Sequence, residues 1–302
     1  MVTGQRLRSS AAIACVILIL GASLCIQLSA AIAKRLFDTV GTVGTSGLRM
    51  AVAALVLIVL TRPVLWGRPL REWAGIVLYG VAMAAMNVSF YNAVANLPLG
   101  MAVTLEFLGP FFVAFFGTRS RWDSMFPLTA LAGVGLIGDS TSGLSVAGLA
   151  WGLSAALAFG GYTVLAGYVG SASTGFSGLS LSVTVGALLL APFSAAAAPR
   201  VPGIGGWLAL AASGVIGVAI AFSFTYTATR LTSPRVTGTL LAVDPAMGAL
   251  IGALVLDQRL TAAAGLGIAL VVVSGAAVAW LAGAQRGKTG ASTEERVELR
   301  KH

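Results

Sequence analysis

The sequence predicts an all-α membrane protein of ten transmembrane helices, and its composition is the main reason. Apolar residues make up 57% of the 302 residues, charged residues make up only 10%, and the mean hydropathy is +0.93. Soluble domains carry roughly 25% charged residues, because a folded surface of this size must face water. A spanning helix takes about 20 apolar residues, so the chain has room for ten spans, their loops and a tail.

Apolar runs between charges or Gly/Pro breaks mark the expected helices. They cover residues 11–33, 42–61, 73–95, 99–117, 124–139, 146–168, 176–197, 204–228, 236–256 and 261–283. The last segment, 284–302, mixes charges of both signs and is expected to be a polar cytoplasmic tail. Arg6 and Arg8 before the first run resemble the start of a signal peptide, but the run is longer than a usual signal core.

The surplus of basic residues sets the expected orientation in the membrane. The 19 Lys and Arg residues, against 10 Asp and Glu, are scattered singly between apolar runs, which argues against a nucleic-acid partner. Ten spans place fourteen of these cations on the side of the two termini and four on the opposite side. Cytoplasmic loops carry the excess of Lys and Arg, so both termini are expected in the cytoplasm.

A weak internal repeat divides the chain into two units of five spans. A shift of 135 residues places Tyr91 on Tyr226 and Pro110 on Pro245. The units expected from this shift are residues 11–139 and 146–283. Because five spans is an odd number, the second unit enters the membrane from the opposite face. Such an inverted five-plus-five repeat is typical of secondary transporters, whose sites lie near the midplane.

Three ionisable residues fall inside expected spans: Arg49, Glu106 and Asp244. Each costs at least about 2.5–3.5 kcal/mol in lipid, so each should face protein or water. Pro110 lacks the N–H that would bond the carbonyl of residue 106, and Pro245 leaves a free carbonyl near Asp244. Glu106 is interpreted either as a substrate or proton site facing a central cavity, or as a structural partner of Arg49. Asp244 is either a second site residue or a group that fixes the helix break.

Further polar residues share helix faces within the expected spans. They are Ser23, Gln27 and Lys34 in the first span, Asn87 and Tyr91 in the third, Trp151, Ser154 and Tyr162 in the sixth, and Thr225 and Tyr226 in the eighth. A cavity that binds a zwitterion needs such donors and acceptors. The alternative interpretation is hydrogen bonding between helices, worth about 0.6 kcal/mol for each bond, with Lys34 and the tyrosines as interface anchors.

The sequence lacks the motifs that are typical of several other functional classes. No G-x-x-x-x-G-K-[ST] phosphate loop is present, which argues against an ATP-driven pump. The single histidine, His302, lies in the tail, so no metal site, cofactor or catalytic triad is expected, and the chain is not expected to be an enzyme. No sequence repeats in the manner of a selectivity filter, which argues against a channel.

Motifs in the first half carry a resemblance to a known family. In the third and fourth spans they are Met86-Asn87, Phe90-Tyr91, Pro98-Leu99-Gly100, Leu105-Glu106-Phe107 and Gly109-Pro110; in the first two they are Gln27, Ala33-Lys34, Leu36-Phe37 and Leu48-Arg49. These stretches resemble amino-acid exporters of the EamA branch of the drug/metabolite transporter superfamily. The specific motifs cover roughly residues 20–125. The second half matches mainly as a generic repeat, and Asp257 stands where the superfamily usually has Glu.

The resemblance implies ten helices in two inverted repeats and export of small amino acids such as threonine and homoserine. It implies the bacterial inner membrane as the location and an ion gradient, with protons as the expected ion, as the driving force. Substrate identity, direction, stoichiometry and oligomeric state are left open. One alternative is an exporter of the same fold for another metabolite or drug. Another is a membrane scaffold or sensor, which would not need Glu106 at midplane.

The charge distribution gives a testable topology. A reporter that is active only in the cytoplasm should be active when fused after Lys301, because the cationic loops and both termini share one side. The loop near Ser142 should react with a membrane-impermeant label from outside. Activity of a periplasm-dependent reporter at the same C-terminal fusion point would overturn this orientation.

Overall fold

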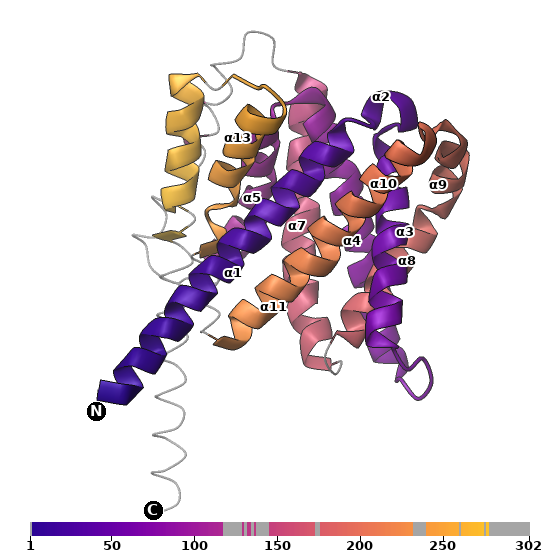
Figure 1. Cartoon of the computed structure of the whole chain (residues 1–302), viewed down its shortest axis with the longest axis horizontal. Coiled ribbons are helices and arrows are strands. Elements are labelled where there is room, and N and C mark those ends of the chain that lie inside the picture. Colours follow the sequence, from indigo (N-terminus) through magenta and orange to yellow (C-terminus); the bar gives the residue numbers. More distant parts are fainter. Residues whose placement is uncertain are drawn as a thin grey trace, which may run out of the picture.

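The computed structural model is helical, and no strand occurs in the part of the chain that it describes (Figure 1). It describes residues 2–116, 129, 132–133, 136, 145–172, 176–231, 240–259, 261–274 and 276–277. Five helices in these ranges are long and apolar enough to cross a membrane, and a bent pair raises the number to six. The chain is therefore a multi-pass membrane protein, while the expected count of ten spans stays a prediction.

The N-terminal half follows the apolar pattern closely. Its helices are α1 (Val2–Lys34), α2 (Phe37–Val40), α3 (Thr42–Thr61), α4 (Leu70–Asn96) and α5 (Leu99–Phe116). The bounds of α3 are those expected from the sequence, and α4 begins three residues before the expected position. The chain turns between α2 and α3 at Gly41, whose φ of 81° is a conformation that suits glycine. The expected fifth span, 124–139, lies almost wholly outside the described residues.

The second half contains more breaks than the apolar pattern predicts. Its helices are α7 (Val146–Ala172), α8 (Ser177–Leu189), α9 (Ala191–Ala197), a 3₁₀ turn (Ala198–Arg200), α10 (Gly203–Gly214), a π-helical turn (Val215–Ile220), α11 (Ala221–Leu231), α13 (Asp244–Val255) and a helix at Ala262–Ser274. The expected span 176–197 is not one straight helix, because its two parts are bent by 59°. Pro192, in the first turn of α9, has no N–H to continue the preceding helix.

The expected ninth span, 236–256, is also corrected by the structure. Instead of a kinked continuous helix, a turn at Ala242 and Val243 separates Leu241 from α13, which begins at Asp244. Pro245 therefore lies in the first turn of α13 rather than in a helix interior. Proline favours this position, since the first N–H groups of a helix have no partner within it. Pro110, in contrast, lies inside α5. The tail, 284–302, lies outside the described residues.

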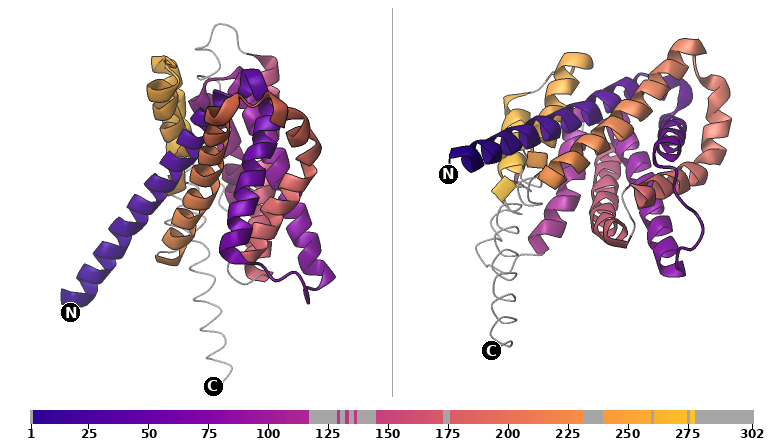
Figure 2. Two further views of the ribbon diagram at one scale, coloured as in Figure 1. Left: turned by 45° about the vertical axis from the view of Figure 1, so that its right-hand side comes forward. Right: turned by 60° about the horizontal axis from the view of Figure 1, so that its bottom comes forward.

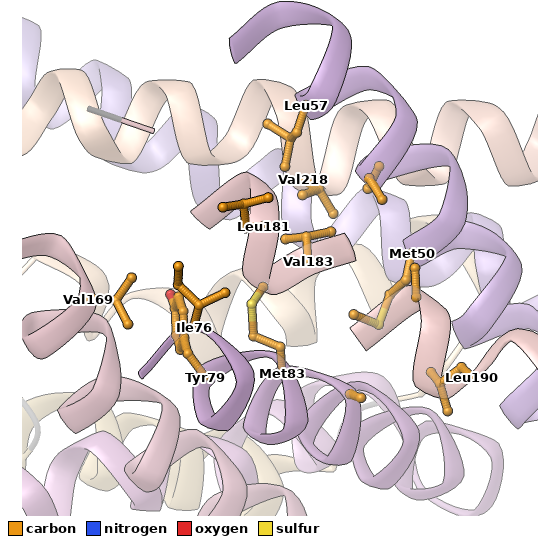
Figure 3. Packing of buried hydrophobic residues seen from close by; sticks show 14 residues of the cluster. Met50, Leu57, Ile76, Tyr79, Met83, Val169, Leu181, Val183, Leu190 and Val218 are labelled. Carbon is orange, nitrogen blue, oxygen red and sulfur yellow. The ribbon is translucent and has the colours of Figure 1, made fainter. Parts of the chain in front are cut away.

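The largest apolar core joins α3, α4 and α8 (Figure 3). Met50 of α3, Ile76 and Met83 of α4, and Leu181 and Val183 of α8 belong to this cluster. Lipid tails are as apolar as these side chains, so the cluster gains little from leaving lipid. Its contribution is close packing, which fixes how α3 and α4 lie side by side.

Glycines let α5 approach two other helices closely. A Cβ atom at Gly109 would lie 2.0 Å from the carbonyl oxygen of Ala156 on α7, and one at Gly100 would lie 2.6 Å from the Cα of Ala249 on α13. Such close crossings at small residues are the usual basis of helix packing in membranes. They fix the position of α5 between α7 and α13.

The first helix lies along the second half of the chain. In Figures 1 and 2, α1 runs diagonally beside α10 and α11, while its N-terminal end extends away from the other helices. Gly21 marks one contact, since a Cβ there would lie 3.0 Å from the ring of Phe224. Segments about 200 residues apart in sequence therefore share one side of the bundle.

The α5–α7 crossing yields a stability prediction. Gly109→Ala should destabilise the protein by about 1–3 kcal/mol, because the added methyl group overlaps the backbone of α7 and the two helices must move apart to accommodate it. The measurement is the midpoint of thermal unfolding of the purified protein in detergent.

Gly161→Ala on α7 is the matched control. A Cβ there meets nothing within 4 Å, so this variant should unfold at or above the wild-type temperature. Equal midpoints for the two variants would show that the α5–α7 crossing is looser than the structure indicates.

Candidate functional site

A buried guanidinium lies at the centre of the candidate site. Arg49 of α3 is only 7% exposed, and its Nη1 donates a hydrogen bond to the hydroxyl of Tyr91 on α4. The guanidinium carbon lies 5.3 Å from the centroid of the Tyr91 ring, within cation–π range. Tyr91 is fully buried against the rings of Phe37 and Phe90, at centroid distances of 5.2 and 6.0 Å. Tyr91 therefore has little freedom, and it holds the end of the Arg49 side chain in place.

Arg49 also lies against the π-helical turn between α10 and α11. A Cβ at Gly217 would be 2.7 Å from Arg49 Nη2 and 2.2 Å from the hydroxyl of Ser29 on α1. Ser29 Oγ donates to the carbonyl of Ser213 at 2.7 Å, and Ser213 Oγ donates to the carbonyl of Ser29 at 3.0 Å. This reciprocal pair ties α1 to α10 beside Arg49. Single π-helical turns occur frequently at functional sites.

Two carboxyl groups extend the site, Glu106 within electrostatic range of Arg49 and Asp244 within range of Glu106. Glu106, in the middle of α5, is partly exposed although its neighbours Leu105 and Phe107 are buried. It is within electrostatic range of both Arg49 and Asp244. Among the described residues, neither carboxyl lies within 4.0 Å of a cationic nitrogen, so the direct ion pair between Glu106 and Arg49 that the sequence left open is not formed.

Buried polar atoms without partners gather around these groups. Asp244 interacts with Ser23 of α1, yet Ser23 Oγ and Asp244 Oδ1 are both buried without a partner at hydrogen-bonding geometry in the described part of the chain. Two more buried atoms lack a partner in this part of the chain: Gln27 Oε1, one turn after Ser23, and Arg49 Nε. Each unsatisfied group costs about 1–3 kcal/mol, which indicates that water or a ligand completes these bonds.

Tyrosines from α4 and α7 extend the cluster on the side of Glu106. Tyr162 of α7 interacts electrostatically with Glu106, and its ring lies 5.0 Å from that of Tyr79 and 5.4 Å from that of Phe159. Tyr79 is not among the residues singled out from the sequence. The sequence signal for Tyr79 is a spacing of four residues along α4, which runs from Tyr91 to Asn87, Met83 and Tyr79.

The structure brings most of the candidate residues together but separates others. Asn87 is partly buried and donates to the carbonyl of Met83 in its own helix, at 2.9 Å. Tyr226 lies on α11, and its side chain lies outside the described ones. Trp151 and Ser154, expected to share the inner face of their span with Tyr162, are exposed and so do not line the cluster.

Lys34 has a structural role at the end of α4. Its Nζ donates to the carbonyl of Val94 at 2.7 Å. This carbonyl belongs to the last turn of α4, where carbonyl groups lack partners within the helix and a cation is favourable. The interpretation of Lys34 as a cavity residue therefore gives way to that of a helix cap.

The cluster combines one cation, two carboxyls and several hydroxyl and amide groups in an otherwise apolar bundle. Within the described residues no group of three or more His, Cys, Asp or Glu could hold a metal ion. The functional groups come from α1, α3, α4, α5, α7 and α13, so both halves of the chain contribute. Such an arrangement can bind a small molecule that carries both charges.

Comparison with known proteins matches the chain to one family in both halves. The model of the EamA-like transporter family matches residues 13–138 and again residues 146–280. The threonine/homoserine exporter RhtA of Escherichia coli (strain K12) is 30% identical over 253 residues, which is 82% of this chain and 84% of that protein. RhtA of Salmonella typhimurium (strain SL1344) is 30% identical over 242 residues, 78% of this chain and 81% of that protein.

A solved structure supports the fold. One crystal structure aligns with a TM-score of 0.58 and 20% sequence identity, covering 90% of this chain and 97% of that chain. At this identity the likeness concerns the architecture alone. The double match of the family model agrees with the duplication that the offset of 135 residues indicates.

The Ser29–Ser213 pair beside Arg49 gives a quantitative prediction. In a double-mutant cycle of Ser29→Ala and Ser213→Ala, the coupling free energy should be about 0.6–1.7 kcal/mol, the range for hydrogen bonds between membrane helices. It is measured from the reversible unfolding of the four proteins in mixed micelles.

A second cycle, of Ser29→Ala with Ser154→Ala, serves as the reference. Ser154 is exposed and bonds within its own helix, so the two substitutions should be additive within about 0.5 kcal/mol. Additivity in the Ser29–Ser213 cycle as well would mean that the pair does not hold α1 to α10.

Proposed function

This chain belongs to the EamA-like transporter family, and we propose that it is an inner-membrane secondary transporter that exports small amino acids of the threonine and homoserine type. The observation that carries the proposal is the cluster of Arg49, Glu106 and Asp244 inside an apolar bundle. Charged groups at membrane depth mark substrate and ion pathways in membrane proteins. The exporter relatives support the direction and the substrate class, and they favour a transporter over an enzyme or a scaffold.

We also propose proton coupling through Glu106. Its carboxyl group forms no hydrogen bond or ion pair with the described residues, so it is free to take either a proton or the ammonium group of a substrate. If the two cannot occupy the carboxyl together, substrate leaving on one side allows a proton to enter from the other. This exchange is the basic requirement of an antiporter.

The arrangement proposed for the membrane follows from the two halves. Residues 11–139 and 146–283 act as inverted repeats, both termini lie in the cytoplasm, and the cluster lies near midplane between them. Missing backbone hydrogen bonds near the cluster support this view, since Pro110 within α5 has no N–H to offer the carbonyl of Glu106, and Asp244 begins α13 after a turn. Irregular backbone at membrane depth is tolerated where it lines a polar space or is buried in protein.

The decisive test measures export and one substitution together. Cells loaded with a labelled amino-acid panel should lose threonine and homoserine faster with the gene than without it. The amide of Glu106→Gln retains size and hydrogen bonding but does not take up or release a proton. This variant should therefore reduce gradient-driven export at least about 100-fold at equal membrane abundance.

Glu72→Gln is the matched control. This carboxylate pairs with Arg68 at the start of α4, away from the cluster, so the variant should export at the wild-type rate. Wild-type export by Glu106→Gln would show that the carboxyl group is structural. Export of a different class from the panel would redirect the proposal to another metabolite or drug.

A further inference from the structure

The guanidinium of Arg49 has more hydrogen-bond donors than the described protein satisfies. An arginine carries five N–H donors in a fixed fork. In Arg49 one bond, from Nη1 to Tyr91, is formed with the described residues, and the buried Nε has no partner. A buried cation left in this condition is unfavourable unless an anion or water completes its bonds. The fork geometry suits a carboxylate, which can accept two parallel bonds.

The carboxyl groups of Glu106 and Asp244, in contrast, lack hydrogen-bond donors. Glu106 has no hydrogen bond with the described residues, and Oδ1 of Asp244 is buried without a partner. Carboxylates only accept hydrogen bonds, so the group that completes them must be a donor, and an ammonium group supplies three. The carboxyls come from α5 and α13, which are held together at Gly100.

The charges of Arg49 and Glu106 form no direct ion pair, which leaves room for a ligand between them. Glu106 interacts electrostatically with both Asp244 and Arg49, yet no carboxylate oxygen of the described residues lies within 4.0 Å of an Arg49 nitrogen. In an α-amino acid, the carboxylate and the ammonium are attached to the same carbon atom. Such a molecule can therefore span a gap between opposite charges that is too wide for a direct ion pair.

We propose that the site orients its substrate by charge: the α-carboxylate binds the Arg49–Tyr91 pair and the α-ammonium binds between Glu106 and Asp244. This inference rests on the proposed function for the choice of an α-amino acid. It assigns Arg49 and Tyr91 to carboxylate recognition, with Tyr91 positioning the guanidinium. It also predicts that a molecule with only one of the two charges is rejected, because one side of the site then stays unpaired.

The test compares ligands that lack one charged group. Purified wild-type protein in proteoliposomes is given labelled threonine with increasing concentrations of unlabelled threonine, L-threoninol or 3-hydroxybutyrate. Threoninol lacks the carboxylate and 3-hydroxybutyrate lacks the ammonium group. Each should compete at least about 30-fold more weakly than threonine, as expected when one partner of a buried charge pair is removed. Competition by threoninol equal to that of threonine would overturn the role of Arg49.

Substitutions at Arg49 and Tyr91 assign the carboxylate contact to its residues. In Arg49→Gln, threonine should bind as weakly as threoninol, so the discrimination between them should disappear while that against 3-hydroxybutyrate remains. Tyr91→Phe, which retains the ring, should show a smaller loss of the same kind. The exposed Arg71→Gln at the start of α4 should retain full discrimination. Retained discrimination in Arg49→Gln would overturn the inference.

A binding measurement separates this inference from the proposed export. The shift in thermal unfolding of the purified wild-type protein is recorded with glycine, alanine, threonine and glutamine, and with the two single-charge analogues. If cells do not export threonine or homoserine but zwitterions still stabilise the protein selectively, the proposed export fails and the inference stands. If no zwitterion stabilises the protein or competes for transport, the inference is overturned.

Discussion

The close approach of α5 to α7 and to α13 is the constraint on which the candidate site depends. At Gly109 and Gly100 the helices cross with no room for a side chain, so backbone meets backbone. In lipid there is no hydrophobic force to draw helices together, and contact at this distance is what fixes their positions. Glu106 lies between the two glycines on α5, and its position relative to α7 and α13 is therefore set by both crossings.

The second constraint is the cost of polar groups at membrane depth. Most of the polar side chains in the bundle are satisfied locally: Thr104, Ser154 and Thr163, for example, donate to carbonyls one turn back in their own helices. The Arg49 cluster differs, because Ser23 Oγ, Gln27 Oε1, Arg49 Nε and Asp244 Oδ1 are buried there without a hydrogen-bond partner among the described residues. Buried hydroxyls of Ser46, Thr61 and Ser180 also lack partners among the described residues, but in the Arg49 cluster charged groups are in this condition, and that difference favours a binding role for the cluster.

The two halves of the chain are related but not equivalent. Pro110 and Pro245 correspond at an offset of 135 residues, and the family model matches both halves. Yet Pro110 lies inside a continuous helix, whereas Pro245 lies in the first turn of a helix that follows a break. Glu106 therefore lies in the middle of a helix, whereas Asp244 lies at the start of one. The two halves therefore contribute their acidic groups to the candidate site from different backbone positions.

The sequence by itself determined the membrane class, most helix positions, the duplication and the identity of the charged residues, because lipid forces apolar runs into helices and makes buried charges conspicuous. It placed α3 at its observed bounds and singled out Arg49, Glu106 and Asp244. It did not find the break before α13, since a proline in an apolar run fits a kink as well as a helix start. Only the tertiary structure decided which groups meet: that Arg49 bonds to Tyr91 rather than Glu106, that Tyr79 joins the cluster and that Trp151 faces outward. Helical spacing gives the face on which a residue lies, but the partner of that face depends on how segments far apart in the chain pack together.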